Sequence, residues 1–75
     1  MARMNTSVRG DAPTARELEV LALIAGGKTT KEAAQLLGIT FKTAATHRMH
    51  IMTKLHAHKA ADLTRAAIRL GLVQP

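Results

Sequence analysis

The residues most able to carry chemistry in this chain are polar side chains repeated at helical spacing near its middle. One face of a helix would carry Lys42, Thr46, Met49, His50 and Thr53. No acidic residue occurs anywhere between positions 33 and 61. Lysine, threonine and histidine can donate hydrogen bonds to base edges and to phosphate oxygens. The sequence therefore predicts that four of these residues read DNA bases: Lys42, Thr46, Met49 and His50.

A second set of side chains is expected to hold the DNA backbone. Thr29, Thr30 and Thr40 occur where helices are expected to begin, and a helix N-terminus offers free N–H groups and a positive dipole end to phosphate. The residues expected to contact the backbone are Thr29, Thr30, Lys31, Thr40, Thr43 and Lys54. Together the two sets predict that the chain binds a polyanion.

Length and composition restrict the classes of protein to which the chain can belong. It has 75 residues, with 11 Lys and Arg against 5 Asp and Glu, no cysteine and a single aromatic residue. A chain this short forms one compact core, and the lack of cysteine excludes a disulfide framework and a cysteine-based zinc finger. No apolar run approaches the roughly 20 residues needed to span a bilayer, so we expect a cytoplasmic protein without membrane contact. A net charge of +6 favours nucleic acid as the partner, although a merely solvated basic surface is the alternative.

The pattern of apolar residues and helix caps predicts an all-α fold of four helices after a flexible tail or linker over residues 1–12. Thr14 and Glu17 have capping-box spacing, as do Thr29 and Glu32, and Thr40 would cap a longer helix that ends near position 55. Gly26-Gly27, Gly38 and Gly71 are expected to end helices. The expected inward residues are Val20, Leu21 and Ile24; Ala33, Ala34 and Leu37; Ala44, Arg48, Ile51 and Leu55; and Leu63, Ala67 and Leu70.

The two middle helices have the order expected of a helix-turn-helix motif. A short helix, a turn containing glycine and a longer basic helix span about residues 29–48. The second helix of such a pair fits the major groove, with its N-terminal half against the base edges. The helix over about 40–55 is therefore the expected recognition helix.

Residues at many positions along the chain match the sequence pattern of one family. They are Thr14-Ala15-Arg16-Glu17, Val20-Leu21, Gly27, Lys31-Glu32, Ala34, Leu37, Thr43, His47, Ile51, Lys54-Leu55 and Gly71-Leu72. The sequence resembles the LuxR/FixJ-type helix-turn-helix domain, the C-terminal DNA-binding module of many bacterial response regulators (NarL-like) and quorum sensors. The resemblance implies a four-helix domain over residues 13–75 that binds double-stranded promoter DNA. It also implies a dimer formed through the fourth helix, about residues 59–70.

The fourth helix carries a small surface suited to weak self-association. Ala61, Arg65 and Ile68 lie beside its inward face, and the small residues Ala60, Ala61 and Ala66 would let two helices approach closely. Such a patch is smaller than a stable standard interface. We therefore expect a weak homodimer that is stabilised on DNA.

The chain departs from the family pattern at several positions. Ala33 and Ala44 stand where the family usually has Ile and Val, and Pro13 stands where it has Leu. Leu36 and Phe41 are candidates to fill the resulting space, although Phe41 could instead be exposed. Ala45 replaces a lysine on the flank of the recognition helix that commonly contacts DNA in the family.

Three other interpretations are weaker. Residues 22–29 match a relaxed phosphate-loop pattern, but no strand precedes them. His47 and His50 have a spacing that metal ligands use, yet no acid or cysteine lies near them in sequence, and His47 fits better as a hydrogen-bonded structural residue. With no cysteine and no converging carboxylates, we expect neither an enzyme nor a cofactor. The alternative function is a helical protein-interaction module that docks on an acidic partner such as RNA polymerase.

Overall fold

The computed structural model describes residues 12–75, which form four helices and, within that range, no strand. The helices are α1 (Ala15–Ala25), α2 (Thr30–Leu37), α3 (Phe41–Lys54) and α4 (Ala60–Arg69). This confirms the expected all-α class and element order. Of the tail expected over residues 1–12, only Ala12 lies within the described residues. No described helix is long and apolar enough to cross a membrane.

Local hydrogen bonds at the helix starts explain where three helices begin. The Thr14 hydroxyl accepts from the Glu17 N–H at 3.2 Å, and the Glu17 carboxylate accepts from the Thr14 N–H at 2.9 Å. Thr29 and Glu32 make the same reciprocal pair. The Thr40 hydroxyl accepts from the Thr43 N–H at 3.1 Å. Each cap satisfies backbone donors that a helix N-terminus leaves free, so all three predicted caps are confirmed.

The helix ends show one feature that the sequence did not predict. Gly38 closes α2 with φ of 69°, in the left-handed region that glycine tolerates best. His56, just after α3, has φ of 54° although it carries a side chain. The Ala57 N–H then donates to the Met52 carbonyl at 2.8 Å, which completes the turn out of α3. A histidine therefore occupies a position that glycine would fill with less strain.

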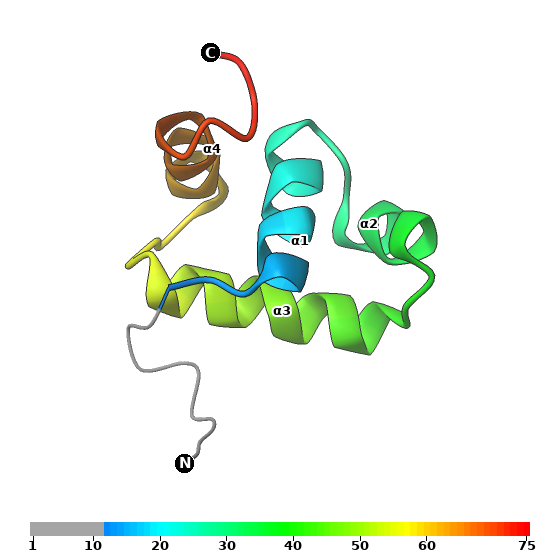
Figure 1. Cartoon of the computed structure of the whole chain (residues 1–75). Coiled ribbons are helices and arrows are strands. Elements are labelled where there is room, and N and C mark those ends of the chain that lie inside the picture. The colour runs from blue at the N-terminus through cyan, green and yellow to red at the C-terminus, as the bar shows by residue number, and fades with distance from the viewer. Residues whose placement is uncertain (1–11) are drawn as a thin grey trace.

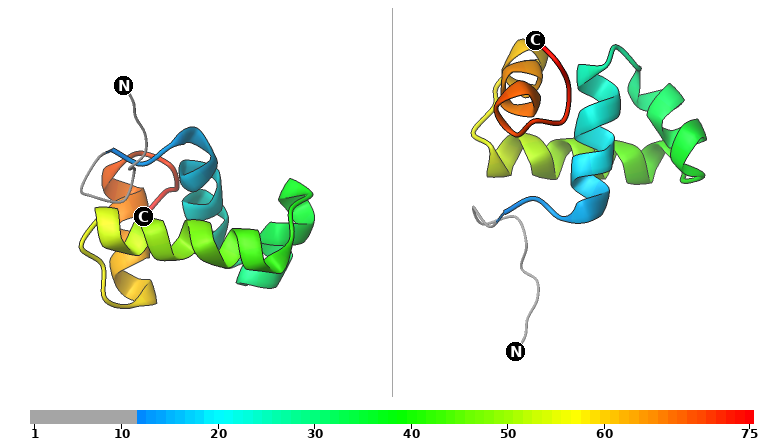
Figure 2. Two further views of the ribbon diagram at one scale, coloured as in Figure 1. Left: turned by 90° about the horizontal axis from the view of Figure 1, so that it is seen from below. Right: turned by 45° about the horizontal axis from the view of Figure 1, so that its top comes forward.

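Helix α1 is the centre of the domain. It lies across α3, with α4 on one side and α2 on the other (Figures 1 and 2). It packs against all three other helices, α2 also packs along α3, and α4 has little contact with α3. The core cluster consists of Val20, Leu21, Ile51, Ala57, Leu63 and Ala67. The fold therefore holds α3 mainly through α1 and α2.

Three expectations about packing are wrong. Leu70, expected inside, is 49% exposed because α4 ends at Arg69 and Leu70 is only its C-terminal cap. Ala66, expected on a dimer surface, is buried in the core. Leu36 is 62% exposed and fills no internal space. Phe41 is also exposed, which is one of the two possibilities that the sequence left open for it. Ala33 and Ala44 are fully buried, so α2 and α3 meet through small side chains instead.

Candidate DNA-binding surface

The outer face of α3 is open and carries no acid. Lys42 and Met49 are exposed, while Thr46 and His50 are half-buried. Together with side chains at the start of α1, part of this face borders a shallow hollow of about 420 Å³. The hollow is lined by Thr14, Glu17, Lys42, Thr43, Thr46, His47 and His50. Three of the four expected base-reading residues thus share one hollow, and Met49 lies outside it.

The start of α2 offers backbone donors to an anion. Thr29 and Lys31 are exposed and Thr30 is half-buried. The cap uses the N–H groups of Thr29 and Glu32, and within the described residues no partner occupies the N–H groups of Thr30 and Lys31. These two groups lie at the positive end of the helix dipole.

The carboxylate of Glu32 lies at the same helix start and opposes an approaching anion. Its pKa is lowered, first by the hydrogen bond from the Thr29 N–H and then by the contact with the Thr29 side chain. Glu32 is therefore ionised at neutral pH. The exposed ammonium of Lys31 lies in the same first turn and offsets this charge.

Thr40 and Thr43 form a small hydroxyl pair at the start of α3. The Thr40 hydroxyl donates to the Thr43 hydroxyl oxygen at 2.9 Å, and both residues are exposed. The Thr43 hydroxyl retains its own proton for an external acceptor. This arrangement suits the contact with the DNA backbone that is expected of both residues.

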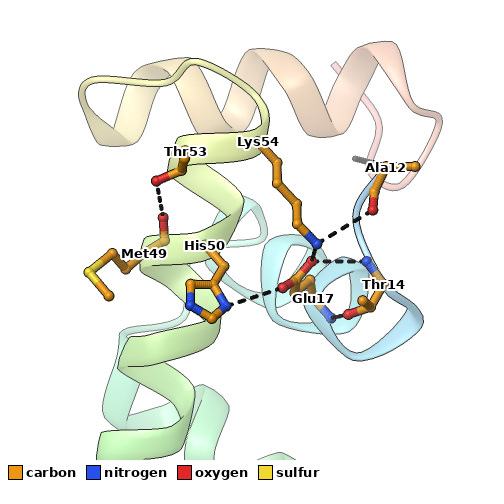
Figure 3. Close-up of polar contacts among 7 residues, drawn as sticks. All are labelled: Ala12, Thr14, Glu17, Met49, His50, Thr53 and Lys54. Atoms are coloured by element: carbon orange, nitrogen blue, oxygen red, sulfur yellow. Dashed lines mark hydrogen bonds and ion pairs between the residues drawn. The ribbon is translucent and has the colours of Figure 1, made fainter. Parts of the chain in front are cut away.

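Lys54 is not available to DNA, contrary to expectation. Its side chain is completely buried, and its Nζ donates to Glu17 Oε1 at 2.7 Å and to the Ala12 carbonyl at 3.5 Å. Figure 3 shows these contacts between the last turn of α3 and the start of α1. A buried lysine needs such a partner, because an unpaired charge in the interior is costly. The predicted phosphate contact of Lys54 is therefore wrong, and its role is to join two helices.

Glu17 is the centre of this polar cluster. Burial acts to raise its pKa, but the hydrogen bonds from Lys54 and the Thr14 N–H and the charges of Lys54 and His50 together hold that pKa below its ordinary value. Its Oε2 atom lies 3.6 Å from His50 Nδ1 (Figure 3). Sequence reasoning treated Glu17 only as a capping residue. Its spacing of three, four and seven residues from Val20, Leu21 and Ile24 could have indicated that it faces inward.

His47 lines the same hollow as His50, but its hydrogen bonding differs from that expected from the sequence. Its Nδ1 atom is buried without a hydrogen-bond partner among the described residues. The hydrogen-bonded role expected of His47 is therefore wrong for this atom. In residues 12–75 no group of three or more histidine and acidic side chains is placed to hold a metal ion.

The remaining candidate residues lie on separate surfaces. Ala45, on the flank of α3, is half-buried. On α4, Ala61 and Arg65 are exposed and Ile68 is half-buried. Arg65 pairs with Asp62, whose carboxylate also accepts from the backbone N–H groups of His58 and Lys59 at the start of α4. The α4 surface is thus small and mixed in character.

Comparison with known proteins gives the family. Residues 13–67 match the family described as bacterial regulatory proteins, luxR family. The chain belongs to the luxR family of bacterial regulatory proteins. Members of this class are DNA-binding transcription regulators rather than enzymes, as the sequence predicted.

Several curated relatives are similar over most of this chain. An uncharacterized response regulatory protein, YgeK of Escherichia coli K12, is 49% identical over 59 residues, which are 79% of this chain and 40% of that protein. The transcriptional regulatory protein LiaR of Bacillus subtilis is 51% identical over 55 residues, 73% of this chain and 25% of LiaR. The transcriptional regulatory protein MctR of Rhizobium johnstonii is 44% identical over 63 residues, 84% of this chain and 29% of MctR.

The chain therefore spans two fifths or less of the length of these three relatives. No solved structure matches it significantly.

Proposed function

We propose that this domain binds operator DNA with α3 in the major groove and thereby directs transcription as the output part of a response regulator. The observation that carries the proposal is the acid-free outer face of α3, together with N–H groups at the start of α2 that have no partner among residues 12–75. At 14 residues, α3 is about 21 Å long, enough to cross the groove. A cytoplasmic location, where bacterial DNA lies, follows from this function.

The two kinds of DNA contact are divided among the side chains by position. Lys42, Thr46 and Met49 approach base edges, because they lie on the outer face of α3. The backbone is held by Thr29, Thr30, Lys31, Thr40 and Thr43. Phosphate contacts give affinity and register, while contacts in the groove give sequence preference. Ala45 leaves one flank of α3 without a cation, whereas the family that the sequence resembles commonly has a lysine at this position.

Measurement of DNA affinity against salt concentration tests the proposal. The dissociation constant for a duplex of about 20 base pairs should rise steeply with salt, because bound phosphates release counterions. Lys31→Ala, which removes a proposed phosphate contact, should reduce the log–log slope by about one, whereas Arg69→Ala, which removes an exposed cation from α4, should leave it unchanged. Salt-independent or absent binding would reject the function.

Selection from a pool of randomised duplexes tests the base-reading assignment separately. Thr46→Ala should change the preferred sequence, because Thr46 is proposed to contact a base edge. Equal losses of affinity on selected and random duplexes would remove Thr46 from that role.

We further propose that two copies pair on DNA through α4, using Ala61, Arg65 and Ile68. Because Ala66 is buried in the core, α4 has less apolar area for a dimer interface than the sequence indicated. This smaller area supports weak pairing in the absence of DNA. Dimeric binding predicts two half-sites about one helical turn apart.

A contact with another protein is a second candidate role for a different surface. Leu36 and Phe41 are 62% and 59% exposed, beside the turn that joins α2 to α3. Exposed large apolar residues commonly mark protein contacts, and RNA polymerase is a partner that a DNA-bound activator can reach. Replacing both residues with serine should lower transcription from a target promoter without lowering DNA affinity. Equal loss of both activities would exclude this role.

A further inference from the structure

His50 is held differently from the other residues on the outer part of α3. Its Nδ1 atom lies 3.6 Å from Glu17 Oε2, and 31% of its side chain is exposed. This separation is too long for a hydrogen bond but is within ion-pair distance. Figure 3 shows the second ring nitrogen on the side away from Glu17. The imidazole therefore has one nitrogen directed at a carboxylate and the other turned away from it.

Positive charge exceeds negative charge around His50 before DNA arrives. On α1, Glu17 supplies the one carboxylate among the described residues that line the hollow, and Lys54 already neutralises it through the contact at 2.7 Å. On α3, Lys42 and His47 line the same hollow, and the positive end of the α1 dipole lies beside it. Phosphates would supply the missing negative charge.

We propose, on the basis of the DNA-binding function above, that His50 contacts a DNA phosphate as an imidazolium and that Glu17 is the positioning residue for this contact. The domain consequently takes up a proton when it binds DNA. This assigns His50 to the DNA backbone, in place of the base-reading role that the sequence indicated.

Only the doubly protonated imidazole presents an N–H group to Glu17 and to a phosphate at the same time. A neutral ring has one N–H, and if Nδ1 carries it towards Glu17, then Nε2 presents only a lone pair. A phosphate oxygen is also an acceptor, so it cannot bind that lone pair. The doubly protonated ring satisfies both Glu17 and a phosphate. Exclusion of water by DNA lowers the local dielectric constant and strengthens both contacts.

The experiment is a pH series of DNA affinity for the whole chain on one duplex of about 20 base pairs at constant ionic strength. Between pH 8 and 5.5 the dissociation constant should fall, by at most about tenfold per pH unit for one linked proton. His50→Gln should remove this dependence. His56→Gln and His58→Gln are matched controls, because both histidines are exposed and lie outside the hollow, and they should keep it.

The role of Glu17 needs a variant that avoids an unpaired buried charge. In Glu17→Gln combined with Lys54→Met, both members of the ion pair are neutral and similar in size. This double variant should fold, retain steep salt dependence and lose most of the pH dependence. Calorimetry in two buffers with different ionisation enthalpies provides an independent readout, because proton uptake adds the enthalpy of the buffer to the binding heat.

The outcomes separate this inference from the proposed function. If the wild-type chain binds DNA and His50→Gln has the same pH profile, the inference is overturned while the function stands. A pH profile retained in the double variant would overturn the positioning role of Glu17. Absence of binding to any duplex at low salt would overturn the proposed function and this inference together.

Discussion

Lys54 Nζ lies 2.7 Å from Glu17 Oε1, although 37 residues separate the two in the chain. The Lys54 side chain is completely buried and that of Glu17 is 3% exposed. This ion pair joins the last turn of α3 to the first turn of α1. It therefore couples the orientation of α3 to that of α1.

Loss of one member of this pair should destabilise the domain severely. We expect Lys54→Met to lower the free energy of unfolding by about 3 kcal/mol, because it leaves the Glu17 carboxylate buried without its cation. The double variant Glu17→Gln, Lys54→Met should be more stable than Lys54→Met alone. Urea denaturation followed by circular dichroism measures the free energy of unfolding of both variants. A double variant that is no more stable than Lys54→Met would contradict this account of the ion pair.

Acid should destabilise the folded chain through Glu17. The pKa of Glu17 is lower in the folded state than its ordinary value of 4.5, so the unfolded state binds more protons in acid. The stability that Glu17 contributes is present above pH 4.5 and is lost as the pH falls through the folded pKa. Thermal melts between pH 2 and 7 should show this loss. The double variant should have a flatter profile over the same range, and an unchanged profile would contradict the assignment.

His56→Gly should stabilise the protein. The left-handed conformation of His56, with φ of 54°, costs a side-chain-bearing residue about 1 kcal/mol more than it costs glycine. The matched opposite change is Gly38→Ala at φ of 69°, where an added Cβ meets no atom within 4 Å and only backbone strain is introduced. We expect His56→Gly to raise the free energy of unfolding by about 0.5–1 kcal/mol and Gly38→Ala to lower it by a similar amount. Two shifts of the same sign in urea denaturation would refute this explanation.

Ala45→Lys should strengthen DNA binding. Ala45 lies on the flank of α3, and a lysine there would add one cation near the groove without displacing a core residue. We expect tighter binding at low salt and a salt slope steeper by about one. Fluorescence anisotropy on one duplex at several salt concentrations measures both quantities. Unchanged affinity at low salt would mean that this flank does not approach DNA.

Ile68→Glu should abolish cooperative binding to a duplex with two half-sites. Ile68 is half-buried on α4, so an added carboxylate would disrupt an interface between two copies while leaving the inner face of the helix in place. Binding to a single half-site and the helical circular dichroism spectrum should remain unchanged. Cooperativity that survives this substitution would place the dimer surface elsewhere.

Local sequence patterns predicted the helices because their signals lie within a few residues of each other. The caps of α1 and α2 each need only a threonine and a glutamate three residues apart, and both form as expected. The turn at Gly38 depends on one residue type. The left-handed His56 was missed because nothing in its own residue type indicates that conformation.

Contacts between distant segments could not be predicted in the same way. Glu17 and Glu32 occupy identical positions in identical local motifs, yet Glu17 is buried beside Lys54 while Glu32 is exposed. Their caps alone do not distinguish them, because the difference in burial arises from the packing of α1 on α3. For the same reason Lys54 was expected at the DNA surface, since a lysine in a basic helix gives no sign of which partner it finds.

The central position of α1 has a consequence for how operators could diversify. Since α3 and α4 both rest on α1 and have little contact with each other, α1 acts as a spacer between the proposed reading element, α3, and the proposed pairing element, α4. In a dimer joined through α4, the distance between the two recognition helices depends on the core side chains of α1, among them Val20 and Leu21. The spacing of half-sites and the sequence of each half-site would then be controlled by separate groups of residues, and each could change in evolution without the other.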